Sequence, residues 1–119
     1  MSTYVDGYVL PVPRARLEEY RQIAAKAGAV WREHGALSYR ECSGDDLAVE
    51  GMLPFTALCG AGPDDTVVFA WVEFASRAER DRINALVMND PRLAGMSPEA
   101  MPFDCRRMAY GGFQTLVAA

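Results

Sequence analysis

The sequence has few of the groups that bind metals or form cross-links. It contains one histidine, His34, and three cysteines, Cys42, Cys59 and Cys105, with no two cysteines in a CxxC spacing. Structural zinc sites need four such ligands, and an odd number of thiols leaves a disulfide framework incomplete. We therefore expect no metal site and three reduced thiols, the state that cysteines have in the cytoplasm.

Long apolar runs and an excess of positive charge are also absent. No stretch approaches the about 20 consecutive apolar residues of a membrane span, and the first residues do not follow the signal-peptide pattern. The 12 basic and 16 acidic residues give a net charge of −4, which opposes binding to nucleic-acid phosphates. The glycine-rich turn at residues 60–65 lacks the spacing of a phosphate-binding loop. These absences predict a cytoplasmic protein with no cofactor and no membrane or nucleic-acid partner.

The composition is that of one folded domain. Of the 119 residues, 50% are hydrophobic and 24% are charged. A chain of this length has enough apolar material for a single core. No internal repeat or long linker divides the sequence, so we expect one domain spanning residues 1–119.

Several stretches show the patterns of β-strands. Most of them alternate between two side-chain faces with a period of two, which is the period of a strand. The most apolar stretch is interrupted only by Glu73, which is typical of a central strand covered on both sides. In the last stretch, Gly111 and Gly112 indicate a bulge or bend. The predicted strands are residues 4–12, 36–43, 66–74 and 105–117, with a short additional strand at 55–59.

Two other stretches repeat apolar residues every three or four positions, which predicts helices. The first covers residues 14–34 and ends at the glycine that follows. Ala24 and Ala27 are small side chains in the middle of its apolar face. We therefore expect that a sheet either approaches the helix closely at these residues or leaves a hollow beside them. The second helix begins at the S-x-x-E capping box of residues 76–79.

The order of these elements predicts an α+β fold. A βαββαβ order is that of the ferredoxin-like arrangement, an antiparallel sheet with two helices on one face. The helices leave the other face of the sheet uncovered, although its strands carry aromatic and aliphatic residues. Packing two such faces together would bury them, so we expect a homodimer with twofold symmetry, a dimeric α/β barrel.

Five stretches of this sequence resemble the YbaA-like family of bacterial proteins of unknown function. They are YVDGYVLPVP, GALSYREC, VVFAWVEFASRAERD, NDPRL and MPFDCRRMAYGGF. The resemblance covers nearly the whole chain and implies membership of the dimeric α/β-barrel superfamily. Cys105 stands where the family pattern suggests glycine, and Ala48 where it suggests proline. The family has no established reaction, so the resemblance implies a fold and no chemistry.

Ionisable residues occur inside the otherwise apolar strands, where burial is costly unless they are paired. One interpretation is that Glu41 or Glu73 forms an ion pair with one of the strand arginines, Arg40, Arg106 or Arg107. The other is that a pocket between the sheet and the helices desolvates a carboxyl group and raises its pKa toward general acid or base chemistry. The catalytic candidates on the second interpretation are His34, Glu73, Asp6 and Tyr110.

His34 and the two tryptophans each allow two interpretations. His34 either caps the end of the first helix or faces the pocket as a base, because no other side chain titrates near neutral pH. Trp31 and Trp71 are either core residues or ligand-binding residues. The candidate ligand-binding residues are Trp31, Trp71, Glu41, Asp104 and Arg106.

Three functions fit the sequence. The first is a homodimeric α/β-barrel protein that binds a small apolar or aromatic molecule. The second is a cofactor-independent enzyme resembling a monooxygenase or an isomerase, which would need a water-poor pocket and a perturbed histidine or carboxylate. The third is a structural or regulatory interaction module that has no pocket. An enclosed pocket of about 300 Å³ or more, lined by Trp31, Trp71 and Tyr110, would favour the first two. A closed core in which Glu73 and Asp6 are fully ion-paired would favour the third.

Overall fold

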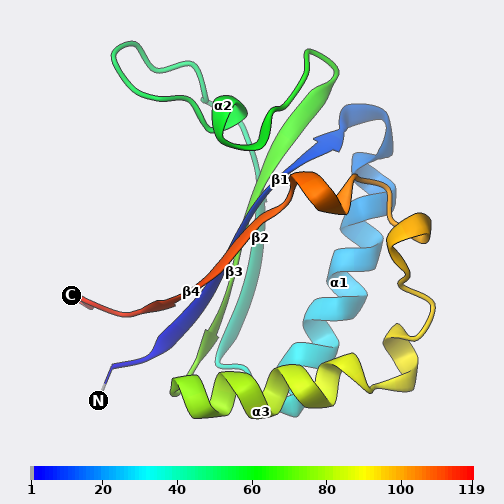
Figure 1. The fold of residues 1–119 in the computed structure, drawn as a ribbon, viewed down its shortest axis with the longest axis vertical. Coiled ribbons are helices and arrows are strands. Elements are labelled where there is room, and N and C mark those ends of the chain that lie inside the picture. The colour runs from blue at the N-terminus through cyan, green and yellow to red at the C-terminus, as the bar shows by residue number, and fades with distance from the viewer. Residues whose placement is uncertain (1) are drawn as a thin grey trace.

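The computed structural model describes residues 2–119, which form an α+β fold around one antiparallel sheet (Figure 1). The predicted α+β class with an antiparallel sheet is therefore confirmed. The strands are β1 (Tyr4–Pro13), β2 (Ser38–Ser43), β3 (Asp65–Phe74) and β4 (Ala109–Gln114). The helices are α1 (Leu17–His34), α2 (Phe55–Cys59) and α3 (Arg77–Met88), with 3-10 turns η1 (Arg14–Arg16), η2 (Pro91–Leu93), η3 (Pro98–Ala100) and η4 (Cys105–Arg107).

The strand order across the sheet of residues 2–119 is β2-β3-β1-β4, and all neighbouring strands are antiparallel. Asp6 of β1 lies opposite Val72 of β3 on one side and opposite Gly112 of β4 on the other. Even-numbered residues of β1, β3 and β4 therefore share one face with odd-numbered residues of β2, such as Tyr39. We call this the helix face because α1 and α3 pack on it, and we call the opposite side the open face.

The sequence signals for the end of α1 and the start of α3 are confirmed, whereas α1 begins at Leu17 because residues 14–16 form the 3-10 turn η1. α1 ends at His34, and Gly35 follows with a φ of 119°, a left-handed conformation that favours glycine. At the start of α3, the Ser76 hydroxyl accepts a hydrogen bond of 3.1 Å from the backbone N–H of Glu79. In the described part of the chain, no helix is long and apolar enough to cross a membrane.

The core lies between the helix face and the two long helices. Val72 and Phe74 of β3 pack against Val30 of α1 and against Ile83 and Val87 of α3, and all five side chains are buried. A second cluster joins β1, β3 and the first half of α1. The residues of β1 and β3 in both clusters are even-numbered. The period-two alternation of a strand therefore determines which of its side chains reach the helices.

Two predicted strands differ in the structure. Residues 55–59 form the short helix α2 instead of a strand, with Pro54 before it and Gly60 in the left-handed conformation after it. Five apolar residues are too few to show a period, so these flanking residues decide the outcome. At the other strand, residues 105–107 form η4 because the Asp104 carboxylate accepts from the backbone N–H of Arg106. The strand prediction for residues 105–117 therefore holds only for Ala109–Gln114.

The predicted bulge at the two glycines of β4 is also not found. The pairing of β4 with β1 runs without interruption from Val9 opposite Ala109 to Tyr4 opposite Gln114. Gly112 lies instead beneath the Tyr4 phenol, which occupies the space that a Cβ at this position would need. The glycine accommodates a neighbouring aromatic ring and does not interrupt the strand.

Candidate functional site

A partly open cavity lies between the helix face, α1 and residues 91–108, which we call the cover segment. This inner cavity has a volume of about 180 Å³. Its walls are almost entirely apolar and combine aromatic rings with thioethers. The aromatic residues are Tyr8, Tyr20, Trp31, Tyr39 and Phe103, and the methionines are Met96, Met101 and Met108.

Small residues of α1 create the space for this cavity. Ala24 and Ala27 are both buried and line it, where larger side chains would fill it. One turn further, Gly28 allows the Tyr39 ring to lie against the helix, since a Cβ on Gly28 would be 2.6 Å from the ring. The small residues of α1 were expected either to leave a hollow or to let the sheet approach closely. The structure shows both, with a hollow beside Ala24 and Ala27 and a close approach of Tyr39 at Gly28.

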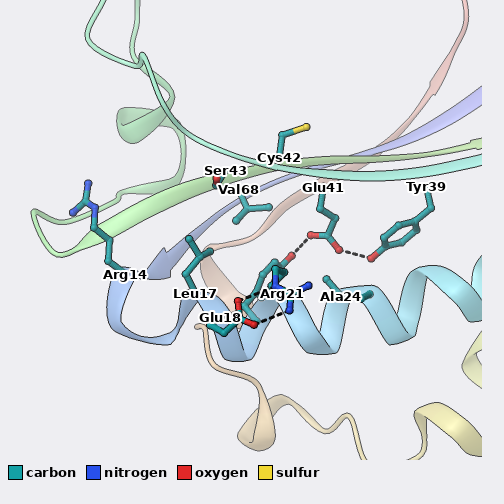
Figure 2. Close-up of a pocket in the computed structure, with 12 residues that line it drawn as sticks. Arg14, Leu17, Glu18, Arg21, Ala24, Tyr39, Glu41, Cys42, Ser43 and Val68 are labelled. Atoms are coloured by element: carbon teal, nitrogen blue, oxygen red, sulfur yellow. Dashed lines mark hydrogen bonds and ion pairs between the residues drawn. The ribbon is translucent and has the colours of Figure 1, made fainter.

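Glu41 of β2 places a carboxylate in the wall of the inner cavity. The Tyr20 hydroxyl donates a hydrogen bond to Oε1 and the Tyr39 hydroxyl donates to Oε2 (Figure 2). Burial, and then the charge of Glu41, raises the pKa of both phenols. Tyr20 and Tyr39 therefore remain protonated donors at neutral pH and hold the carboxylate from two sides.

A wider groove adjoins the inner cavity on the other side of Glu41. This outer groove has a volume of about 650 Å³ and shares Tyr20, Ala24, Tyr39 and Glu41 with the inner cavity. Its charged rim includes Arg21 and Glu18, which form an ion pair of 2.7 Å (Figure 2). The carboxylate of Glu41 thus lies at the boundary between the inner cavity and the outer groove.

Asp6 is at the centre of a second polar cluster on the helix face. Its side chain is 0% exposed and accepts hydrogen bonds from Arg80 at 2.9 Å, Asn84 at 3.2 Å and Tyr110 at 3.0 Å. Burial, and then the Asp6 charge, raises the pKa of Tyr110. Asn84 in turn accepts from the indole N–H of Trp31 at 3.0 Å. This cluster therefore fixes one of the rings that line the inner cavity.

The cover segment is attached to the rest of the protein near both ends. At its start, Asp90 accepts from Arg92 and from His34 Nε2, each at 2.8 Å, and these contacts hold the pKa of Asp90 well below its usual range. Near its end, Arg107 lies 3.4 Å from Asp65. Between these points, Phe103 packs edge-on against Tyr20, with ring centroids 5.6 Å apart.

His34 does not face the inner cavity. Its imidazole pairs with Asp90 at the end of α1, so the structure supports neither the pocket base nor a cap on the last helix carbonyls. It connects the first long helix to the cover segment.

Two other predicted site residues lie on the open face. Trp71 and Glu73 are odd-numbered residues of β3, and the pairing with β1 directs them away from α1 and α3. Glu73 accepts a hydrogen bond of 3.3 Å from Thr3, and Trp71 packs against Phe69. The expected grouping of Glu73 with Asp6 and Tyr110 is therefore not found, because the odd and even positions of a strand face opposite sides.

Asp104 and Arg106 pair with each other outside the inner cavity. The Arg106 guanidinium lies 3.1 Å from the Asp104 carboxylate, and the Arg106 side chain is 91% exposed. In residues 2–119, neither Glu41 nor Glu73 forms the expected ion pair with Arg40, Arg106 or Arg107. The two carboxylates bind hydroxyl groups instead.

The sequence reasoning missed the partners that organise both clusters. The helical spacing of residues 14–34 places Tyr20 on the apolar stripe, but it does not indicate that the Tyr20 hydroxyl binds Glu41. Arg80 and Asn84 are not among the predicted site residues. Arg80 lies three positions before the buried Ile83 of α3, and Asn84 lies one position after it. A polar pair at helical spacing beside buried residues is the signal that would have indicated them.

Comparison with known proteins gives the family context of this site. The family model described as "Protein of unknown function (DUF1428)" matches residues 3–105. The uncharacterized protein YbaA of Escherichia coli (strain K12) is 40% identical over 114 residues, which cover 96% of this chain and 97% of that protein. YbaA of Shigella flexneri matches to the same extent. The similarity therefore extends over both long helices and the entire sheet.

Proposed function

This chain belongs to the DUF1428 family, as its resemblance to YbaA-like proteins predicts, and we propose that it binds a small aromatic or other apolar molecule in the inner cavity. The observation that carries the proposal is an apolar cavity of about 180 Å³ that is lined by five aromatic rings. An engineered apolar cavity of about 150 Å³ is known to bind benzene. The inner cavity is thus large enough for one substituted ring.

The polar groups in the wall support the same function. Ligand sites are typically apolar spaces with a few fixed polar groups that orient the occupant. Here Glu41 is held by two phenols, so its position does not depend on a ligand. Trp31 is held by Asn84 in the same way. A preformed wall lowers the entropy cost of binding.

A cavity-filling substitution tests the proposal. Ala27 is buried and lines only the inner cavity, whereas Ala25 is exposed and lines only the outer groove of the same helix. Indole binding, measured by ligand-detected NMR, is expected to weaken about tenfold or more in Ala27→Leu, equivalent to about 1.4 kcal/mol. The matched control Ala25→Leu should bind indole as the natural protein does. Equal indole binding in both variants would contradict the proposal.

The protein as purified from cells offers an independent measurement. Mass spectrometry of the extracted native protein should detect a small apolar molecule, and Ala27→Leu should lose it. A molecule retained equally by both proteins would be bound elsewhere.

We also propose that the fold is ferredoxin-like and that two copies pair through the open face as a dimeric α/β barrel. The strand order and the position of both long helices on one side support the ferredoxin-like arrangement (Figure 1). On the open face, Phe69 is 43% exposed and Phe113 is 62% exposed. Monomeric proteins seldom leave such aromatic surface uncovered. A second copy would supply the same surface, related by a twofold axis.

Light scattering after size-exclusion chromatography tests the dimer. The natural protein should elute at twice the chain mass of 13.1 kDa. Phe113→Arg places a charge on the open face and should give the single-chain mass, whereas Leu116→Arg lies beyond β4 and should not change the assembly. A stable single chain for the natural protein at micromolar concentration would refute this proposal.

The other two functions fit the geometry less well. The inner cavity is smaller than the expected pocket of about 300 Å³, and of the three expected residues only Trp31 lines it. The ion pair of Asp6 with Arg80 favours an interaction module, but the presence of the inner cavity speaks against a module that has no pocket. A cofactor-independent monooxygenase or isomerase stays a prediction, and its base would have to be Glu41, because His34 and Glu73 point elsewhere.

A further inference from the structure

The inner cavity carries a single charged side chain in its wall among the described residues, the carboxylate of Glu41. The two groups that contact this carboxylate, Tyr20 and Tyr39, are neutral phenols. They satisfy hydrogen bonds without cancelling the negative charge. The site therefore has an electrostatic preference that its apolar walls alone would not give.

Arg80 of the neighbouring cluster and the two arginines that line the outer groove have hydrogen-bond or ion-pair partners of their own. Asp6 and Arg80 form an ion pair of 2.9 Å in the neighbouring cluster. In the outer groove, Arg21 pairs with Glu18, and the Arg14 guanidinium donates to the carbonyl of Pro63 at 2.7 Å. None of these arginines contacts Glu41, whose hydrogen bonds come from phenols. A cation able to enter the cavity would thus meet a carboxylate that lacks a cationic partner.

The carboxylate also has unused acceptor capacity. An ionised carboxylate has about four acceptor sites on its two oxygens. Tyr20 takes one on Oε1 and Tyr39 takes one on Oε2, which leaves one on each oxygen. A primary ammonium group has three N–H donors and is suited to such sites, and charge-assisted hydrogen bonds are the stronger kind.

The walls around Glu41 suit the rest of such a molecule. Aromatic faces attract cations through their quadrupoles, at ring centroids within about 6 Å. The rings and the thioethers of the methionines would pack against an apolar body. We propose that the occupant of the inner cavity is a small organic primary amine, with its ammonium group on Glu41 and its apolar body between the aromatic rings. This inference rests on the proposed function and adds the chemical class of the ligand.

Three probes of similar size and different charge test the inference. Calorimetry at neutral pH should show that benzylamine binds about tenfold more tightly than benzyl alcohol, and that benzoate binds more weakly than either. The Glu41→Gln variant should remove the preference for benzylamine, because glutamine keeps the size and loses the charge. The matched control Glu50→Gln alters an exposed loop residue and should keep the preference.

The outcomes separate the two proposals. If benzyl alcohol binds as tightly as benzylamine and Ala27→Leu excludes both, the amine inference is wrong and the proposed function stands. If neither these probes nor indole binds in a way that depends on Ala27, both proposals are wrong. The comparison of hexylamine with hexanol on the natural protein gives the same decision without a variant, so it holds even where Glu41→Gln does not fold.

Discussion

Neutralising Asp6 is expected to destabilise the protein more than any other single charge removal. Three donors, from Arg80, Asn84 and Tyr110, converge on this fully buried carboxylate. In Asp6→Asn, the amide group has nearly the same shape as the carboxylate, but its NH₂ is a donor. It would face at least one of the three donors, so at least one hydrogen bond would be lost. The Arg80 side chain, which is 14% exposed, would then keep only its 2.8 Å ion pair with Asp81, which stabilises little because the Asp81 side chain is 61% exposed.

The magnitude follows from the cost of an unpaired buried charge. Removing one partner of a buried ion pair typically costs about 3–5 kcal/mol, because the other charge stays desolvated. We expect Asp6→Asn to lower the free energy of unfolding by this amount. Arg80→Met removes the positive charge that Asp6→Asn leaves behind. The double variant Asp6→Asn/Arg80→Met should therefore lose about 2 kcal/mol less free energy of unfolding than the two single variants lose in sum.

Urea unfolding at one fixed protein concentration measures these values, since assembly would otherwise shift the transition. Glu18→Gln is the matched control. It breaks the Glu18–Arg21 pair on the surface of α1, where both side chains are 65% exposed, and it should have a far smaller effect. A loss of less than about 1 kcal/mol in Asp6→Asn would refute the argument that the cluster holds a desolvated charge.

Three further predictions concern the phenols and the glycines. Burial is the largest cause that raises the pKa of Tyr8, Tyr20 and Tyr39. Their contribution to stability should therefore be complete below about pH 10 and be lost as the pH rises above it. Tyrosinate absorbance in the native protein should lag behind that of the unfolded chain. Gly28→Ala should cost about 1–3 kcal/mol in urea unfolding, because the new methyl group overlaps the Tyr39 ring. Gly35→Ala should cost about 1–2 kcal/mol, because its φ of 119° is unfavourable for alanine; no change in either variant would contradict these geometries.

Local patterns in the sequence predicted most of the fold. The alternation of Tyr4, Asp6 and Tyr8 placed these residues on one face, and the helix face confirms it. The S-x-x-E signal placed the start of α3, because capping depends on residues within one turn. Residues 55–59 were assigned wrongly, since their structure depends on what precedes and follows them.

The candidate site was harder to predict because its partners are distant in the sequence. Glu41 meets Tyr20 across 21 positions, and Asp6 meets Arg80 across 74. A period-two pattern states that residues share a face but does not state which face the helices cover. Trp71 and Glu73 were therefore grouped with a pocket that lies on the other side of their own strand.

The way in which the cover segment is attached has a consequence for exchange. It is held at its start by Arg92, which pairs with Asp90 and Glu33, and near its end by Arg107, so lifting either end would break an ion pair. Its middle contains Gly95, where a Cβ would meet nothing within 4 Å. Stiffening that middle would slow arrival and departure of a bound molecule by the same factor. A ligand bound as proposed would therefore have a residence time that depends on the middle of the cover segment and an affinity that depends on the cavity walls.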